Sequence, residues 1–361
     1  MKQNIFKVGT VIGLLLLTGF FTSCEEKKTN TKLESGNIAK KEEVIKKIYK
    51  KPRNPIVFIT GYDKGQNKFY NNARTYFKEK KYQIVNDMYS LEEIIGWMNS
   101  NVTEKPYGEI HIVNYNNPLK GLSLETTING EKVTIESLQR AINQSKLPKI
   151  NKGINANSKI VFHSNGVGNN EELLNTLKLS FKSDEMPQIL ASPYFNVFGG
   201  EFTNHFLAKP YYVFYPTAHS PGKVDLSKEI ARKYPNEKEI DWFSALTNER
   251  ERYIGEPYTK QFNIPIMWEL DYENSDDDVP TFVMQEELMD FIAGDVDLIT
   301  DVKKLNIPVE KFRWTYTVKN NKLIIKGKAS VLCVLKPLTK PYGDLEHIKP
   351  DTNNKRLYAM K

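Results

Sequence analysis

A short polar turn near the middle of the chain carries side chains that could do chemistry. The sequence KIVFHSNGVG predicts a buried strand ending at His163, followed by a turn of Ser164, Asn165 and Gly166 before a helix. Enzymes often place a nucleophile on such a turn, where a neighbouring imidazole can take its proton. Ser164 is therefore one candidate nucleophile, and His219 in the segment YPTAHSPG is a candidate base.

Two other predicted strand ends carry polar residues. The apolar run IVFI is followed by Gly61, Tyr62 and Asp63, and the run IHIV is followed by Asn114, Tyr115 and Asn116. In parallel sheets, ligands meet the loops at the carboxyl ends of the strands. We therefore expect these loops and the turn after His163 to share one edge of a sheet and to form one cleft.

Strands and helices alternate along residues 53–220. The strands are short apolar runs, and the segments between them have apolar residues at helical spacing, as at Phe69, Ala73 and Phe77. The predicted strands lie at 56–59, 82–85, 108–113, 158–163 and 186–195, with 210–216 as a sixth candidate. This alternation predicts a three-layer α/β/α core with a mainly parallel sheet.

Residues 221–361 have a different pattern of predicted elements. The segments VDLSKEIARKY and EELMDFIAGDVDLITDVKKL read as helices. Trp314, Tyr316 and Val318 alternate along a strand pattern that turns at Asn320-Asn321 and continues into a second strand. The sequence therefore predicts a C-terminal α+β extension that ends in a β-hairpin.

The order of the core elements resembles the caspase-like cysteine peptidases, including the separase and CHAT branches. In that group a strand ends in a His-Gly pair, a hairpin and a helix follow, and the next strand ends in a turn with the catalytic Cys. Here GLSLETTINGEKV predicts the hairpin and Thr134 begins the helix. The resemblance puts Tyr115-Asn116 at the His-Gly pair and Asn165 at the Cys, an interval of 50 residues.

Both catalytic roles are lost in that alignment. A carboxamide such as that of Asn165 cannot attack a carbonyl group usefully, because the chemistry of the group needs a thiolate. A tyrosine with an ordinary pKa of about 10 is a poor base at neutral pH. The resemblance therefore implies a non-catalytic scaffold with a polar cleft at Asp63, Tyr115, Asn116, His163, Ser164, Asn165 and Gly166.

A second resemblance leaves catalysis open. The segment FHSNG is similar to the G-x-S-x-G turn of α/β-hydrolases, although Phe162 replaces the first glycine. That resemblance implies a serine hydrolase with Ser164 as nucleophile and His219 as base. A third alternative is a purely structural protein in which side chains fill the cleft.

The N-terminal segment resembles a bacterial lipoprotein signal. Lys2 and Lys7 precede an apolar run that is too short to span a bilayer, and small residues lead to Cys24. In such signals residues 1–23 are removed and the cysteine receives lipid. Glu25 and Glu26 are similar to the surface-export tag of Bacteroidetes lipoproteins. Residues 24–52 are polar and predict a tether, so we expect attachment to the outer membrane through Cys24, with possible exposure at the cell surface.

Composition limits the remaining possibilities. Removal of residues 1–23 would lower the formal charge from +7 to +5, and the lysines are interspersed with acids, so nucleic acid is not an expected partner. Cys333 lies in an apolar run and is expected in the core. We expect no metal and no cofactor; the acidic run 276–278 lacks the glycine and the spacing of a calcium loop.

Together these patterns predict a lipid-anchored envelope protein with a degenerate caspase-like domain. Its expected role is non-catalytic binding of a peptide, a protein or a polymer at the cleft. The serine hydrolase and the purely structural protein remain the alternatives.

Overall fold

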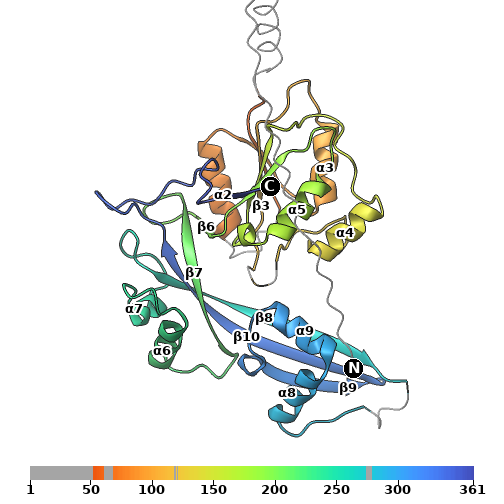
Figure 1. Cartoon of the computed structure of the whole chain (residues 1–361), viewed down its shortest axis with the longest axis vertical. Helices are drawn as coiled ribbons and strands as arrows, with labels where there is room; N and C mark the ends of the chain where they lie inside the picture. Colours follow the sequence, from red (N-terminus) through yellow and green to blue (C-terminus); the bar gives the residue numbers. More distant parts are fainter. Residues whose placement is uncertain (1–51, 61–67, 118, 120, 274–278) are drawn as a thin grey trace, which may run out of the picture. The chain divides into compact units, whose positions relative to one another are not determined.

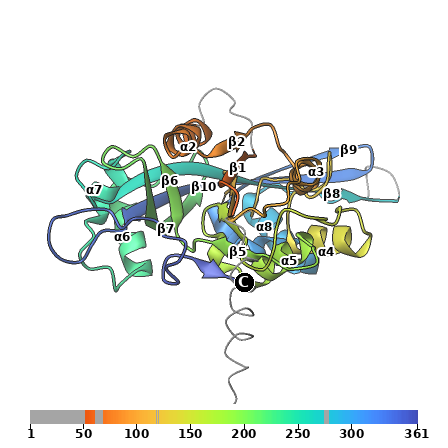
Figure 2. The ribbon, with the colours of Figure 1, turned by 90° about the horizontal axis from the view of Figure 1, so that it is seen from above.

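Two β-sheets organise the part of the chain that the structure describes (Figures 1 and 2). The computed structural model describes residues 52–60, 68–117, 119, 121–273 and 279–361. Cys24 and Asp63, as well as the acidic run 276–278, lie outside these residues.

The first sheet is parallel except for one edge strand. Its order is β11-β5-β4-β3-β1-β2, and only β11 pairs antiparallel. The strands are β1 (Ile56–Ile59), β2 (Gln83–Val85), β3 (Glu109–Val113), β4 (Lys159–His163), β5 (Gln188–Ala191) and β11 (Ala359–Met360). The prediction of an α/β fold with a mainly parallel sheet is confirmed.

Helices pack on both faces of this sheet, which explains why its central strands are continuous apolar runs. Val57 and Ile59 contact α2 (Lys68–Glu79), whereas Phe58 and Ile112 belong to the core that includes α3, α4 and α5. These helices span Leu91–Ser100, Ile135–Asn143 and Glu171–Ser180, and the short η1 helix (Val167–Asn169) precedes α5.

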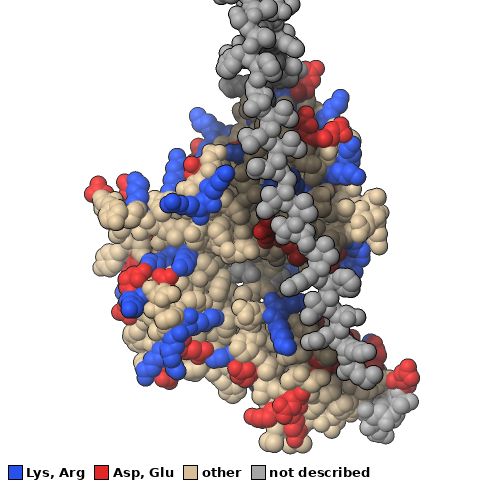
Figure 3. All heavy atoms as spheres, in the orientation of Figure 1, with Lys and Arg blue, Asp and Glu red and all other residues tan. Residues whose placement is uncertain are grey.

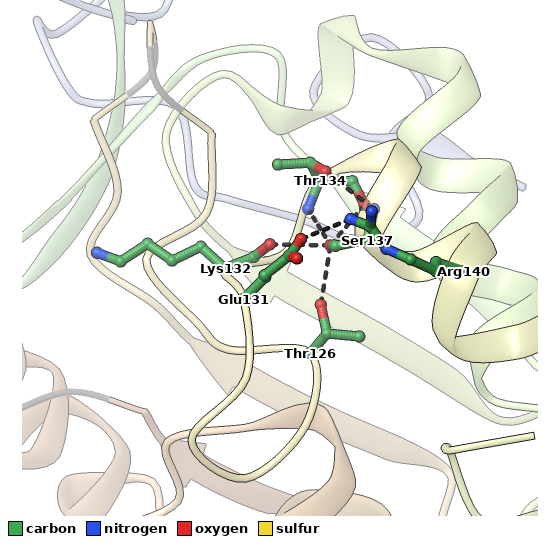
Figure 4. Close-up of polar contacts among 6 residues, drawn as sticks. All are labelled: Thr126, Glu131, Lys132, Thr134, Ser137 and Arg140. Carbon is green, nitrogen blue, oxygen red and sulfur yellow. Dashed lines mark hydrogen bonds and ion pairs between the residues drawn. The ribbon is translucent and has the colours of Figure 1, made fainter. Parts of the chain in front are cut away.

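A buried hydroxyl fixes the segment inserted between β3 and β4 (Figure 4). Ser137 Oγ accepts a hydrogen bond from Thr134 N (2.9 Å), donates to the carbonyl of Lys132 (2.8 Å) and lies 2.9 Å from Thr126 Oγ1. Thr134 Oγ1 in turn accepts from Ser137 N, which completes a capping box at the start of α4. One side chain thus holds the helix against the loop that leads to it.

The second sheet is antiparallel, with the order β6-β7-β10-β8 and with β9 also paired to β10. Its strands are β6 (Phe195–Phe198), β7 (His205–Pro216), β8 (Tyr258–Asp271), β9 (Arg313–Lys319) and β10 (Lys322–Pro337). Asn320 and Asn321 join β9 to β10 with φ values of 52° and 57°, a left-handed conformation that asparagine tolerates.

The sequence offered residues 210–216 as a candidate sixth strand of the parallel sheet. In the structure these residues do not continue that sheet. They belong to β7, which pairs antiparallel with β6 and β10. The physical reason is the short connection from β6 to β7, because a parallel neighbour needs a crossover of a dozen or more residues. The C-terminal strand β11 takes the edge beside β5 instead.

Helices cover both faces of the second sheet over different parts of its length (Figure 1). Helices α6 (Lys223–Lys233) and α7 (Trp242–Thr247) pack on the face that carries Val213 and Leu332. Helices α8 (Gln285–Gly294) and α9 (Val296–Lys304), together with η3 (Val309–Lys311), lie on the opposite face, which carries Trp314.

Replacement of Ser137 by alanine should destabilise the fold. Thr134 N loses its acceptor and the buried Thr126 hydroxyl loses its partner, so we expect a loss of about 1–3 kcal/mol in the free energy of unfolding, measured with urea. Ser227→Ala is the control, because that exposed hydroxyl contacts only the carbonyl of Val224. Equal effects of the two changes would contradict the role given to Ser137.

Candidate functional site

Hydrogen bonds tie together the carboxyl ends of β1, β3 and β4. Asn114 is fully buried; its Nδ2 donates to Thr60 Oγ1 (2.8 Å) and its backbone N–H donates to the carbonyl of His163 (3.3 Å). The Asn114 Oδ1 accepts from Ser123 N (3.1 Å), which attaches the inserted segment to the same place. The three strand ends therefore form one rigid polar edge.

Asn116 and Asn165 bind each other at this edge. The backbone N–H of Asn165 donates to Asn116 Oδ1 (2.5 Å), and Asn116 Nδ2 donates to the carbonyl of Asn165 (3.0 Å). Asn165 Oδ1 accepts from the backbone N–H of Asn196 at 2.9 Å, and all three side chains are buried. The carboxamide of Asn165 is thus occupied within the protein and does not face an open cleft.

The structure does not bring Ser164 and His219 together. Ser164 is fully buried, and its hydroxyl has no hydrogen-bond partner among the described residues. His219 lies on an exposed turn after β7. Gly166, with φ of 71°, turns the chain into η1. A nucleophile must reach both a substrate and a base, and Ser164 reaches neither in this conformation.

His163 lies with two other buried histidines instead of with Tyr115. Its Nε2 is 2.9 Å from His111 Nδ1, and its ring centroid is 5.6 Å from that of His205. The ring of Phe77 packs against both His111 and His163. These three histidines line a pocket of about 360 Å³ to which Lys80, Tyr82, Glu109, Lys349 and Asp351 also contribute.

Burial keeps two of these histidines neutral. It lowers the pKa of His163 well below its usual range and lowers the pKa of His205 to about 3. The neighbouring imidazole of His111 lowers the pKa of Glu109, whose Oε2 lies 3.5 Å from His111 Nε2. Sequence reasoning missed this cluster, because its members come from three strands that are far apart along the chain.

Tyr115 borders a separate cleft of about 460 Å³. Its phenol is largely buried, which raises its pKa, and its backbone N–H donates to Tyr70 Oη (2.9 Å). Consecutive residues 259–262 of β8 also line the cleft. Because neighbouring side chains point to opposite faces of a strand, the cleft extends around β8. The other lining residues are Phe195, Tyr215, Ser220, Lys223, Leu226, Leu246, Asn248, Glu249 and Leu332.

Lys260 is the more buried of the two lysines that line this cleft. Burial lowers its pKa, its Nζ lies 5.8 Å from the ring centroid of Phe195, and it has no ion pair within the described part of the chain. Lys260 lies on the same face of β8 as Tyr258 and Phe262, so an inward-facing lysine could have been read from the pattern YTKQF. A partly buried, unpaired ammonium group is suited to hold an anionic group of a ligand.

Two further observations describe the residues around these sites. In the described ranges, no three His, Cys, Asp or Glu residues are grouped so that they could hold a metal ion. None of the described helices is both long enough and apolar enough to cross a membrane. Cys333 is fully buried as a free thiol, and burial raises its pKa.

Comparison of the chain with known protein families, with curated proteins and with solved structures found no match.

The buried histidines should make stability depend on pH. A neutral histidine with a folded pKa near 3 and an unfolded pKa near 6.5 binds fewer protons when folded, so its contribution to stability is lost as the pH falls from 6.5 to 3. The loss approaches about 1.4 kcal/mol per pH unit for each such group. His205→Phe, which keeps a ring beside Phe198, should flatten this slope in urea unfolding between pH 4 and 7.

The control for this pH series is His219→Gln, since His219 is exposed. This change should leave the slope as it is in the unchanged protein. An equal slope in His205→Phe would show that other groups cause the pH dependence.

Proposed function

We propose that this chain is a lipid-anchored protein of a bacterial envelope that binds a ligand without catalysis in the cleft beside Tyr115. The observation that carries the proposal is the state of Asn165. Its carboxamide stands where the resemblance implies a nucleophile; its Nδ2 donates to the carbonyl of Asn116 (3.4 Å) and its Oδ1 accepts from the backbone N–H of Asn196 (2.9 Å). Because the Asn165 carboxamide is chemically inert and already hydrogen-bonded, we infer that the domain binds a ligand without turning over a substrate.

We further propose that the parallel sheet and its helices are a degenerate caspase-like domain. The support is the order of its parts: β3, an inserted segment with a capped helix, and β4 with its polar turn. Tyr115 and Asn165 stand at the two positions of the catalytic pair, and burial raises the pKa of Tyr115, so even less phenolate is present at neutral pH to act as a base.

The lining of the cleft suits an extended peptide segment with an acidic group. Among the described strands, β8 pairs only with β10, so its other edge is available to a peptide backbone near residues 260–262; the N–H of Thr259 already donates to the carbonyl of Asn248 (2.7 Å). Lys260 can hold a carboxylate, and Phe195 and Phe262 offer apolar contacts. The charges at the rim are mixed, with Lys223 and Glu249, in keeping with the mixed surface in Figure 3.

Lys260→Met should weaken binding of acidic peptides. The change keeps the length of the side chain and removes one charge-assisted hydrogen bond from a partly buried site, so we expect about tenfold weaker binding. Fluorescence anisotropy with labelled octapeptides that alternate aromatic residues and glutamate would measure it. Lys322→Met is the matched control, since Lys322 lies in the same sheet and pairs with Asp271 outside the cleft.

Three results would contradict this proposal. The first is equal affinity of the unchanged protein and Lys260→Met for every peptide in the panel. The second is an adduct of a fluorophosphonate reagent on Ser164 that is absent from Ser164→Ala, which would establish the serine hydrolase instead. The third is peptide turnover that is lost in Tyr115→Phe or Asn165→Ala.

The lipid anchor has its own test. In cells that process lipoproteins, the unchanged chain should fractionate with the outer membrane and its N-terminal peptide should carry the mass of a diacylglyceryl cysteine at Cys24. Cys24→Ser should move the protein to the soluble fraction, because the lipid supplies the membrane affinity. Retention of Cys24→Ser in the membrane fraction would rule out Cys24 as the anchor.

A further inference from the structure

A second groove, separate from the cleft, lies on the open part of the antiparallel sheet. Its volume is about 430 Å³, and three cations line it: Arg313 from β9, and Lys326 and Lys328 from β10. Arg313 and Lys328 are direct partners across the two strands. The other lining residues are Thr217, Pro265, Ile266, Met267, Thr315 and Gly327.

The strand register determines which side chains face this groove. Trp314 packs so closely on Gly327 that a Cβ atom there would lie 2.3 Å from the indole ring. This contact puts Gly327 on the face covered by α8 and α9. Because side chains alternate along a strand, Lys326 and Lys328 then face the uncovered side, where both are exposed.

The three cations lack acidic partners. Within the described residues, Arg313, Lys326 and Lys328 form no ion pair, and the acids nearest along the same face are already held elsewhere. Glu269 and Asp271 lie 3.8 and 3.1 Å from Lys322 Nζ. Glu229 on α6 is paired with Lys311 at 2.7 Å.

An unpaired cationic cluster of this kind is unfavourable in the free protein. Like charges on directly opposed residues destabilise a pair of strands, and Arg313 and Lys328 are such a pair. An anionic ligand would remove that repulsion and form charge-assisted hydrogen bonds with the same groups.

We propose that this groove binds a segment of an anionic polysaccharide, with sulfate, phosphate or carboxylate groups held by Arg313, Lys326 and Lys328. Thr315 and Thr217 offer hydroxyl groups beside the cations, and Met267 and Pro265 offer apolar contacts for the C–H faces of sugar rings. No aromatic ring lines the groove, so nucleotide bases would find no stacking platform there. The concave shape does not match a flat bilayer. The site shares no residue with the cleft beside Tyr115.

Binding of a fluorescein-labelled heparin hexasaccharide to the full-length chain in detergent would test the proposal by anisotropy. We expect binding that weakens as salt rises, about fivefold weaker binding for each of Arg313→Gln, Lys326→Gln and Lys328→Gln, and at least about fiftyfold for the triple variant. Lys322→Gln is the matched control, because Lys322 lies on the same strand and face but is already paired. It should change affinity by less than about twofold.

Thermal unfolding of each variant would check that the fold is kept, and loss of the Arg313–Lys328 repulsion should not lower the melting temperature. Equal affinity of the triple variant and the unchanged chain would overturn the proposal, as would an equal effect of Lys322→Gln. Tighter binding to a thymidine decanucleotide or to phosphatidylglycerol vesicles, lost in the triple variant, would reassign the groove to nucleic acid or to membrane.

Discussion

The chain of buried amides from Asn116 through Asn165 to Asn196 is the contact on which the rest of the candidate site depends. It joins the end of β3 to the turn after β4 and then to β6, and so connects the parallel sheet to the antiparallel one. Each of these groups would be costly to bury without a partner, so the three amides stabilise one another. Within the described residues, the same pairing makes Asn116 and Asn165 unavailable to a ligand at the edge where α/β proteins usually bind ligands.

Asn196 extends this constraint in two directions. Its Nδ2 donates to the carbonyl of Ser164, and its Oδ1 lies 3.4 Å from His205 Nε2. The buried turn after β4 and the histidine cluster thus both contact the side-chain amide of Asn196. The space left for a ligand is therefore displaced toward Tyr115 and β8, where an edge strand and an unpaired Lys260 meet.

The sequence allowed the parallel sheet to be predicted because its strands are uninterrupted apolar runs, such as Ile56–Ile59, that need no distant partner to be recognised. It could not be predicted which sheet contains residues 210–216, because the apolar pattern of a strand does not reveal the strands with which it pairs. The same limit applies to the site. Asn165 was found from its turn, whereas the contact between His111 and His163 depends on pairing of β3 with β4.

The two proposed binding sites differ in how their positive charges are placed. Lys260 is partly buried beside aromatic rings, where desolvation favours a single, well-placed carboxylate. Arg313, Lys326 and Lys328 are exposed and mutually repelling, which favours a ligand with several charges and a loose fit. Both regions lie on β8 and β10 of the antiparallel sheet. The antiparallel sheet therefore contributes residues to both proposed sites, whereas Asn165 at the end of the parallel sheet is already paired within the protein.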